Sequence, residues 1–91
     1  MNYTLHQLRI FTKVCEYGSI TKASEALYLT QPAVSIQLKK LQDEFEIPLT
    51  EVIGRKLYVT SFGKQILELT LDILDKVERL EASVDQYKGI L

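Results

Sequence analysis

Apolar residues follow a helical repeat over the first half of the chain. The first set falls three or four residues apart and predicts an amphipathic helix whose inward stripe is Leu5, Leu8, Phe11, Val14 and Cys15. Thr4 and Gln7 match a capping box at its start. Gly18 suits the left-handed backbone with which helices commonly end, so the helix is expected to stop there.

A second, short helix is predicted for residues 20–27. Ser19 or Thr21 can cap its start. Its inward residues are expected to be Ile20, Ala23, Ala26 and Leu27. The small alanines would let another helix approach closely, and the connector Tyr28-Leu29 that follows is too short to be a flexible linker.

A third helix is predicted from Thr30, its N-cap, to about Glu44. Pro32 is tolerated in the first helical turn, because the N–H group that proline lacks has no partner there. One face carries Val34, Leu38, Leu41 and Phe45. Two helices joined by so short a turn form a helix-turn-helix.

The hydrophobic period changes after the third helix. Two short runs, Leu49 to Val52 and Leu57 to Val59, contain residues that favour strands. Between them, residues 53–56 form a turn that carries two cations. We therefore expect a two-stranded hairpin, or wing, over about residues 49–59.

The rest of the chain predicts one long helix that begins after Thr60, its N-cap. Its residues recur in a heptad seam made of Ile66, Thr70, Ile73, Val77, Leu80, Val84, Tyr87 and Leu91. Leu67, Leu71 and Leu74 lie on an adjoining face near the preceding helices. One stripe can pack on the chain's own core and the other on a second chain, which favours a homodimer. The alternative is that the seam is intramolecular core along its whole length.

These elements predict a mainly α fold, a winged helix-turn-helix with three helices and a two-stranded wing, followed by a long dimerisation helix. We divide the chain into a head, residues 1–60, and the helix, residues 61–91. A core of about 60 residues is only marginally stable alone, so further apolar surface is expected to be buried against a partner.

The composition excludes several classes of protein. The sequence shows no signal peptide and no apolar run long enough to span a membrane, so we expect a cytoplasmic protein without a membrane partner. Cys15 is the single cysteine, cannot form an internal disulfide and is expected to fill the core rather than act in redox chemistry. No zinc-type cluster, catalytic triad or phosphate loop is present, and His6 is expected to face solvent. We therefore expect neither a metal nor an enzyme.

The charge is close to balanced, which argues mildly against nucleic-acid binding, because a basic domain is the usual footprint of that function. The net charge is −1. Residues 1–60 hold seven Lys and Arg against six Asp and Glu, whereas residues 61–91 hold four against six. Nucleic-acid binding by the head would therefore depend on locally clustered cations.

The motifs, taken in order, resemble the N-terminal domain of LysR-type transcription regulators along essentially the whole chain. The matching residues are Leu5, Leu8 and Phe11; Gly18-Ser19, Ala23, Ala26 and Leu27; Thr30-Gln31-Pro32-Ala33-Val34-Ser35, Gln37, Leu38 and Leu41; Pro48-Leu49, Glu51 and Gly54-Arg55-Lys56; and Val59-Thr60 with Gly63. Three positions depart from the family pattern, since Ile36 and Val52 stand where arginine is usual and Thr50 where phenylalanine is usual.

The resemblance implies a DNA-binding transcription regulator that binds an interrupted palindrome as a dimer. The helix at about 30–44 would enter the major groove with its N-terminal end first, and the wing would lie at the minor groove. The expected DNA-binding residues are Lys22, Thr30, Gln31, Pro32, Ala33, Ser35, Ile36, Gln37, Lys39, Lys40, Arg55 and Lys56. No cofactor is expected in this part of the family's chain. A small-molecule effector is expected only in a further C-terminal domain.

Several of these residues could instead have a purely structural role. Lys39 and Lys40 could belong to a solvated helix face, Ile36 could pack inside the protein, and the 53–56 turn could have no ligand. A rival hypothesis for the function is a protein-interaction module. In this hypothesis the head has lost base recognition, and the long helix pairs with a partner. A further alternative is another winged-helix family, such as a metal- or oxyanion-responsive regulator. Binding of duplex DNA at moderate salt would distinguish the DNA-binding hypotheses from the protein-interaction hypothesis.

Overall fold

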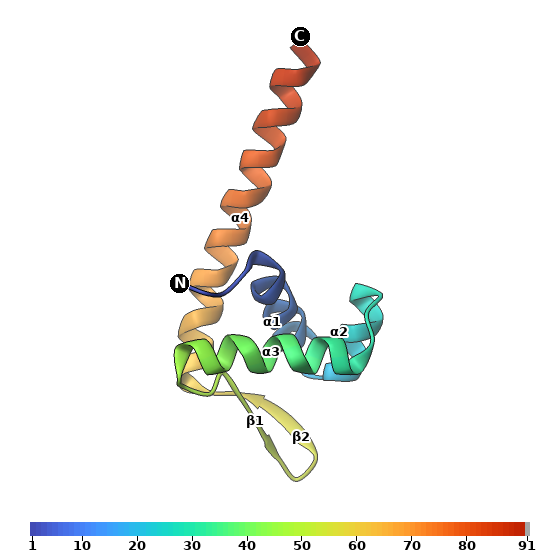
Figure 1. Cartoon of the computed structure of the whole chain (residues 1–91), viewed down its shortest axis with the longest axis vertical. Helices are drawn as coiled ribbons and strands as arrows, with labels where there is room; N and C mark the ends of the chain where they lie inside the picture. Colours follow the sequence, from blue (N-terminus) through green and yellow to red (C-terminus); the bar gives the residue numbers. More distant parts are fainter. Residues whose placement is uncertain (91) are drawn as a thin grey trace.

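The computed structural model describes residues 1–90, and Leu91 of the predicted seam lies outside them. The elements in order are α1 (Leu5–Tyr17), α2 (Ile20–Leu27), α3 (Gln31–Phe45), β1 (Thr50–Ile53), β2 (Lys56–Val59) and α4 (Ser61–Ile90). Figure 1 shows the three short helices and the hairpin gathered at one end, with α4 projecting far beyond them. The predicted winged helix-turn-helix with a long C-terminal helix is confirmed.

Local hydrogen bonds set where the helices begin. The N–H of Gln7 donates to Oγ1 of Thr4 over 3.1 Å, and the N–H of Thr4 donates to Oε1 of Gln7 over 3.0 Å, so the predicted capping box is formed. Ser19, not Thr21, caps α2 by accepting from the N–H of Lys22. Gly18 follows α1 with a φ of 61°, as expected.

The core lies among α1, α2, α3 and the segment that enters the wing. Its buried residues are Leu8, Ile10, Phe11, Val14, Ala23, Val34, Leu38, Leu41 and Leu49. Cys15, Ile20, Leu27 and Phe45 pack partly against it. Most of the predicted inward residues are therefore confirmed.

Two inward predictions are wrong. Leu5 is 41% exposed, because it sits at the first position of α1, where Gln7 and Leu8 take the inward direction. Ala26 is exposed, and Ser24 takes its place in the interior of α2. The Ser24 hydroxyl donates to the carbonyl oxygen of Thr21 over 2.7 Å, so this polar group is buried with a partner.

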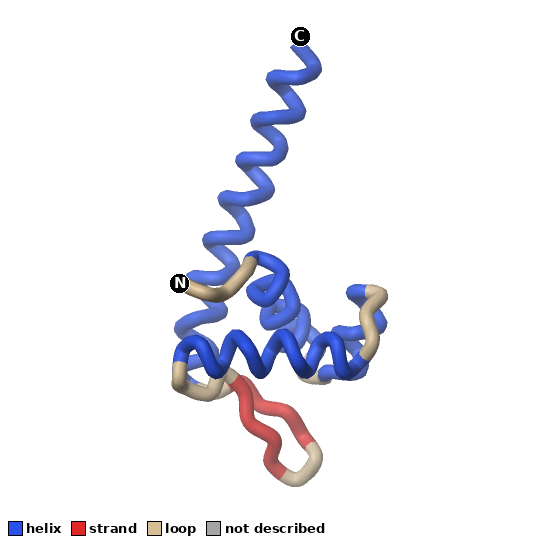
Figure 2. Tube along the Cα trace, viewed as in Figure 1, coloured by secondary structure: helices blue, strands red, loops and turns tan. Residues whose placement is uncertain are grey.

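The wing is a two-stranded antiparallel hairpin (Figure 2), with Thr50 opposite Val59 and Ile53 opposite Lys56. The predicted turn over residues 53–56 is too long, because Ile53 and Lys56 pair with each other and only Gly54 and Arg55 lie between the strands. The first strand begins one residue later than predicted, at Thr50, and Leu49 is buried in the core. The Leu49 carbonyl accepts from the N–H of Thr60 over 3.0 Å, which closes the base of the hairpin.

The first turns of α4 belong to the head. Phe62, Ile66 and Leu67 pack against the core. An edge-on aromatic chain adds to this anchor, with ring centroids 5.2 Å apart for Tyr3 and Phe45 and 6.2 Å apart for Phe45 and Phe62. Thus α4 begins at the expected residue, but its first three turns complete the core of the head.

The outer part of α4 contacts nothing else in the described chain (Figure 1). From Leu80 onward every residue of α4 is exposed. Within residues 1–90, no helix combines the length and the apolar character that crossing a bilayer requires.

Candidate nucleic-acid interface

The face of α3 that points away from the core is open to solvent. The core side of α3 is formed by Val34, Leu38 and Leu41. The exposed residues are Gln31, Pro32, Ser35, Ile36, Lys39 and Lys40, all of them expected DNA-binding residues, together with the acidic residues Asp43 and Glu44 near the C-terminal end of the helix. Figure 1 shows that α3 runs across the head.

The N-terminal end of α3 is held by its cap. The Thr30 hydroxyl oxygen accepts from the N–H of Ala33 over 3.2 Å, and the Thr30 carbonyl accepts from the N–H of Val34 over 3.2 Å. Ala33 is half-buried. The Thr30 side chain is therefore engaged in fixing the helix start, and Gln31 and Pro32 are the exposed residues of the first turn.

Gln37 does not lie on the open face, which corrects the expectation for this residue. It is half-buried, and its Oε1 accepts from Nε2 of Gln7 on α1 over 3.0 Å. Gln7 is itself only 6% exposed. Position 37 is turned toward α1 by the helical repeat, so its side chain joins the two helices instead of standing in solvent.

All five cations expected to bind DNA are exposed. Lys22, Lys40, Arg55 and Lys56 are exposed, and none of them takes part in an ion pair within residues 1–90. Lys39 pairs with Asp43 over 2.8 Å, but both side chains are mostly exposed. Such surface pairs contribute less than about 1 kcal/mol, so Lys39 can exchange its carboxylate partner for another anion.

The wing tip meets the start of α2 at a shallow hollow. The hollow is lined by Gly18, Ser19, Ile20, Thr21, Val52, Arg55, Lys56 and Leu57. Arg55 therefore extends from the wing on the side where α2 begins. Val52 and Ile53 of the same hairpin are 69% and 59% exposed, so the wing presents apolar as well as cationic side chains.

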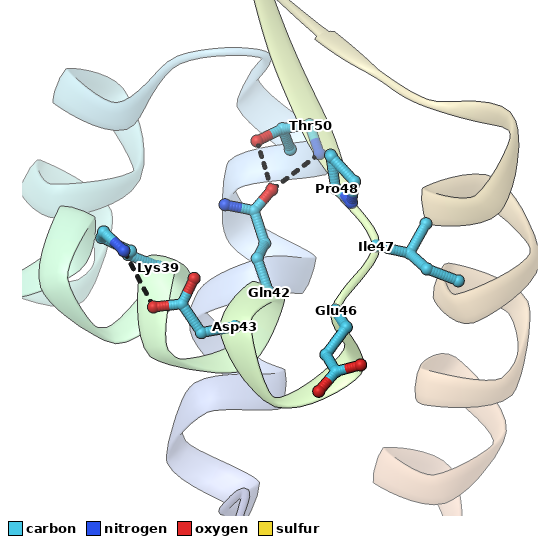
Figure 3. Close-up of a pocket in the computed structure, with 7 residues that line it drawn as sticks. All are labelled: Lys39, Gln42, Asp43, Glu46, Ile47, Pro48 and Thr50. Carbon is cyan, nitrogen blue, oxygen red and sulfur yellow. Dashed lines mark hydrogen bonds and ion pairs between the residues drawn. The ribbon is translucent and has the colours of Figure 1, made fainter.

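Gln42 fixes the wing to α3, and the sequence reasoning missed it. Its Oε1 accepts from the N–H groups of Leu49 and Thr50 over 2.9 and 3.0 Å, and from the Thr50 hydroxyl over 3.2 Å. Figure 3 shows Gln42 reaching from α3 toward Thr50, beside the Lys39–Asp43 pair. One amide oxygen thus sets where the wing leaves α3. A glutamine within a helix carries no sequence signal for such a bond, because its partners are seven and eight residues away.

The predicted seam of α4 divides into a covered and an uncovered part. Thr70 is only 1% exposed, so its assignment to a surface between two chains is wrong, because the head of its own chain covers it. Ile66 is half-buried against the same core. Val77 is half-buried, whereas the exposed seam residues are Ile73, Leu80, Val84 and Tyr87.

No side chains of residues 1–90 gather into a metal site, since no three His, Cys, Asp or Glu residues are suitably grouped there. Cys15 is half-buried, and this burial raises the pKa of its thiol from 9.0 to about 11. A thiol in this state is a poor nucleophile at neutral pH. His6 is exposed, as expected.

Comparisons with known proteins identify this architecture. A family model described as bacterial regulatory helix-turn-helix protein, lysR family, matches residues 5–64. The transcriptional activator CmpR of Synechocystis sp. is 40% identical over 89 residues, which cover 98% of this chain and 29% of the relative. The RuBisCO operon transcriptional regulator of Acidithiobacillus ferrooxidans is 39% identical over 87 residues, which cover 96% of this chain and 28% of the relative.

Two solved structures with bound DNA have the same fold. The BenM DNA-binding domain in complex with catB site 1 DNA gives a TM-score of 0.88 at 30% identity, covering 92% of this chain and 94% of that one. The CbnR DNA-binding domain in complex with DNA gives a TM-score of 0.82 at 28% identity, covering 94% and 95%.

The likeness to curated relatives is confined to one region of them. The chain spans about three tenths of the length of the two relatives named here. The family model covers the three short helices, the wing and the first turn of α4, which are the elements that build the open face. It also decides between the two winged-helix families considered above. The chain belongs to the LysR family of bacterial helix-turn-helix regulatory proteins.

Proposed function

We propose that this chain is the DNA-binding part of a transcription regulator that binds specific duplex sequences as a homodimer. In this proposal α3 enters the major groove, the wing lies at the adjacent minor groove, and two heads bind the half-sites of an interrupted palindrome. The observation that carries the proposal is the open face of α3, which is exposed along its length and carries Lys39 and Lys40, with further exposed cations on α2 and the wing. The DNA complexes of the similar BenM and CbnR domains support it.

Base recognition would fall to the first two turns of α3. The amide of Gln31 can form two hydrogen bonds with adenine, and exposed Pro32 can contact a thymine methyl group. Ser35 can donate to a phosphate, as can N–H groups at the helix start, where the helix dipole favours an anion. Ala33 is half-buried and offers a smaller contact.

The cations would position the head on the sugar-phosphate backbone. Lys22 from α2 and Lys39 and Lys40 from α3 are exposed, so they can contact phosphates of the backbone. Arg55 and Lys56 at the wing tip suit a narrow minor groove, whose negative potential attracts arginine. The net charge of −1 gives little general attraction, so these few contacts would account for most of the salt dependence.

A second copy of this chain is the proposed partner of the exposed seam of α4. The helix has 30 residues, about 45 Å in length, and only its first turns are covered by the head. Apolar side chains that recur every three or four residues on an isolated helix are buried most simply by the same surface of another copy. Joining two heads also raises the effective concentration of the second at its half-site.

The function of the whole protein is a further part of the proposal. The similar CmpR and RuBisCO operon proteins are named as transcriptional regulators, which supports regulation of transcription without enzymatic activity. We propose that the protein acts in the cytoplasm, where bacterial DNA lies. This chain needs no cofactor in the proposal. A small-molecule effector would bind only to a C-terminal domain beyond these residues.

Selection from a pool of random duplexes, followed by sequencing, tests the proposal. We expect enrichment of an interrupted palindrome, weakened when Arg55→Ala replaces the wild type. Lys76→Ala removes one exposed charge from α4, far from the open face, and is expected to leave the enrichment unchanged. No enrichment at low salt, from a chain shown to be folded and dimeric, would overturn the proposal.

A protein-interaction module remains the second candidate function. The near-neutral charge and the exposed apolar residues Ile36, Val52 and Ile53 favour it, because surfaces that bind proteins are poorer in charge than those that bind DNA. The same selection distinguishes the two candidates. A folded dimer that ignores duplex DNA would favour the module.

A further inference from the structure

We propose that Ile36 recognises the 5-methyl group of a thymine in each half-site, and so determines part of the sequence specificity. This inference rests on the proposed DNA binding by the open face of α3. Ile36 is 53% exposed in the middle of that face. A bound partner would bury this exposed isoleucine side chain. The geometry of α3 and the chemistry of the major groove identify the partner group.

Ile36 points as far from the core as α3 allows. At about 3.6 residues per turn, a residue two positions from both Val34 and Leu38 lies about half a turn away from each. Val34 and Leu38 are 0% and 4% exposed, so they mark the side of α3 that faces the core. The opposite side, where Ile36 lies, is the part of α3 that would go deepest into a groove.

The side chain of Ile36 has only apolar contacts to offer. In the major groove, guanine, adenine and cytosine present hydrogen-bonding groups, and the thymine methyl is the one apolar group. Pressing an isoleucine onto a polar base edge would remove water from that edge without replacing its hydrogen bonds. Contact with a thymine methyl instead buries apolar surface on both partners. Ile36 therefore favours thymine and disfavours the other bases.

The neighbours of Ile36 support a base contact over a contact elsewhere. Exposed Pro32 lies one turn before it, and exposed Lys39 and Lys40 lie one turn after it. Ile36 thus stands between the residues proposed to contact bases and those proposed to contact phosphates. The exposed seam proposed for the second chain lies on α4, a different element, so dimerisation does not account for Ile36.

Removing single methyl groups from the DNA tests this inference directly. Each thymine of the selected operator is replaced in turn by deoxyuridine, which lacks only the 5-methyl group, and the dissociation constant is measured. At one thymine per half-site we expect about fourfold weaker binding by the wild type, the effect of leaving one methyl group unburied. Ile36→Ala is expected to bind thymine and deoxyuridine equally at that position.

Two controls keep the result specific. Ile47→Ala truncates an isoleucine that is 46% exposed in the loop after α3, and it is expected to retain the full thymine preference. Ile36→Val removes a single carbon and is expected to show an effect between those of the wild type and Ile36→Ala. Because position 36 is exposed, both Ile36 variants are expected to fold like the wild type, as circular dichroism can verify.

Placing 5-methylcytosine at the same position gives an independent outcome. The wild type is expected to bind it about fourfold more tightly than unmethylated cytosine, while Ile36→Ala is expected to show no difference. The inference is overturned if no thymine shows a methyl effect that depends on residue 36. That result differs from failure of the proposed function itself, in which the wild type selects no sequence at all and no operator exists to be substituted.

Discussion

Arg55 occupies a backbone conformation that favours glycine. Gly54 has a φ of 55° and Arg55 a φ of 70°, and the two residues form the whole loop between paired Ile53 and Lys56. Two successive positive φ values describe the tight turn that suits the twist of a hairpin. A side chain in this region costs about 1 kcal/mol or more. Backbone strain is thus retained at the residue that we propose to bind the minor groove. Strained residues are often found at functional sites.

Arg55→Gly is expected to stabilise the fold while weakening DNA binding. Glycine relieves the strain of the positive φ, and its greater freedom in the unfolded chain offsets part of this gain. The free energy of unfolding is therefore expected to rise by about 0.5–1 kcal/mol. Urea unfolding measures the first effect, and duplex titration measures the second. Lys56→Gly is the control, because Lys56 lies in β2, where glycine destabilises. Equal or lower stability of Arg55→Gly would contradict the argument from strain.

Cys15 provides a prediction about alkaline pH. Burial raises the pKa of its thiol from 9.0 to about 11, so the folded state keeps the proton to higher pH than the unfolded chain does. The corresponding stability is fully present below pH 9 and is lost as the pH rises from 9 to about 11. Unfolding free energies measured across this range should therefore fall more steeply for the wild type than for Cys15→Ala. Parallel curves for the two proteins would show that the thiol does not titrate in this way.

The base of the wing and the start of α4 pack closely at Gly63. A Cβ atom at this position of α4 would overlap the carbonyl oxygen of Leu49 and would lie 2.8 Å from Cγ1 of Val59. The Thr60 hydroxyl ties the same region together, since it donates to the Pro48 carbonyl over 2.7 Å and accepts from the N–H of Gly63 over 2.9 Å. The base of the wing and the start of α4 therefore form one packed unit.

Gly63→Ala is expected to lower the free energy of unfolding by about 1–3 kcal/mol, because the added methyl group meets backbone that cannot move aside. Gly89→Ala is the matched control on the same helix, with no atom within 4 Å of an added Cβ. It is expected to be neutral or to stabilise by up to about 1 kcal/mol, since alanine favours helix more than glycine. Thermal unfolding followed by circular dichroism checks both. Equal effects of the two changes would refute the close packing at Gly63.

The shape of the whole molecule leaves apolar surface without a partner. The chain measures 55 × 25 × 20 Å, and the long dimension follows α4 as it leaves the head (Figure 1). Leu80 and Tyr87 are 64% and 67% exposed on the outer part of this helix. The head of this chain does not reach them, which is consistent with the proposed pairing of α4 with a second copy.

Leu80→Glu is expected to convert the dimer to a monomer at micromolar concentration, because it places a charge in the middle of the proposed seam. Ala82→Glu adds the same side chain two positions away, where α4 faces the opposite side, and is expected to leave the dimer intact. Sedimentation velocity measures the assembly, and circular dichroism reports whether the head stays folded. A monomeric wild type, or a Leu80→Glu protein that remains dimeric, would exclude this seam.

The sequence alone determined the order of the elements and most of their ends. Caps act through hydrogen bonds that span only three or four residues, as between Thr4 and Gln7 or at Thr30, so the local pattern carries the information. The ordered motifs pointed to the LysR family, and most of the residues expected on the DNA side are exposed, including Gln31, Ile36 and Arg55.

Only the tertiary structure decided which side of each element is covered. Thr70 falls in a regular heptad position, yet its own head buries it, because the same repeat results whether the covering surface is in one chain or in two. Gln37 was expected on the DNA side of α3, yet its amide oxygen accepts from Gln7 of α1, thirty residues earlier. Gln42 holds the wing through backbone groups that no motif marks. Periodicity fixes directions around a helix axis, whereas what lies in each direction depends on how distant segments pack.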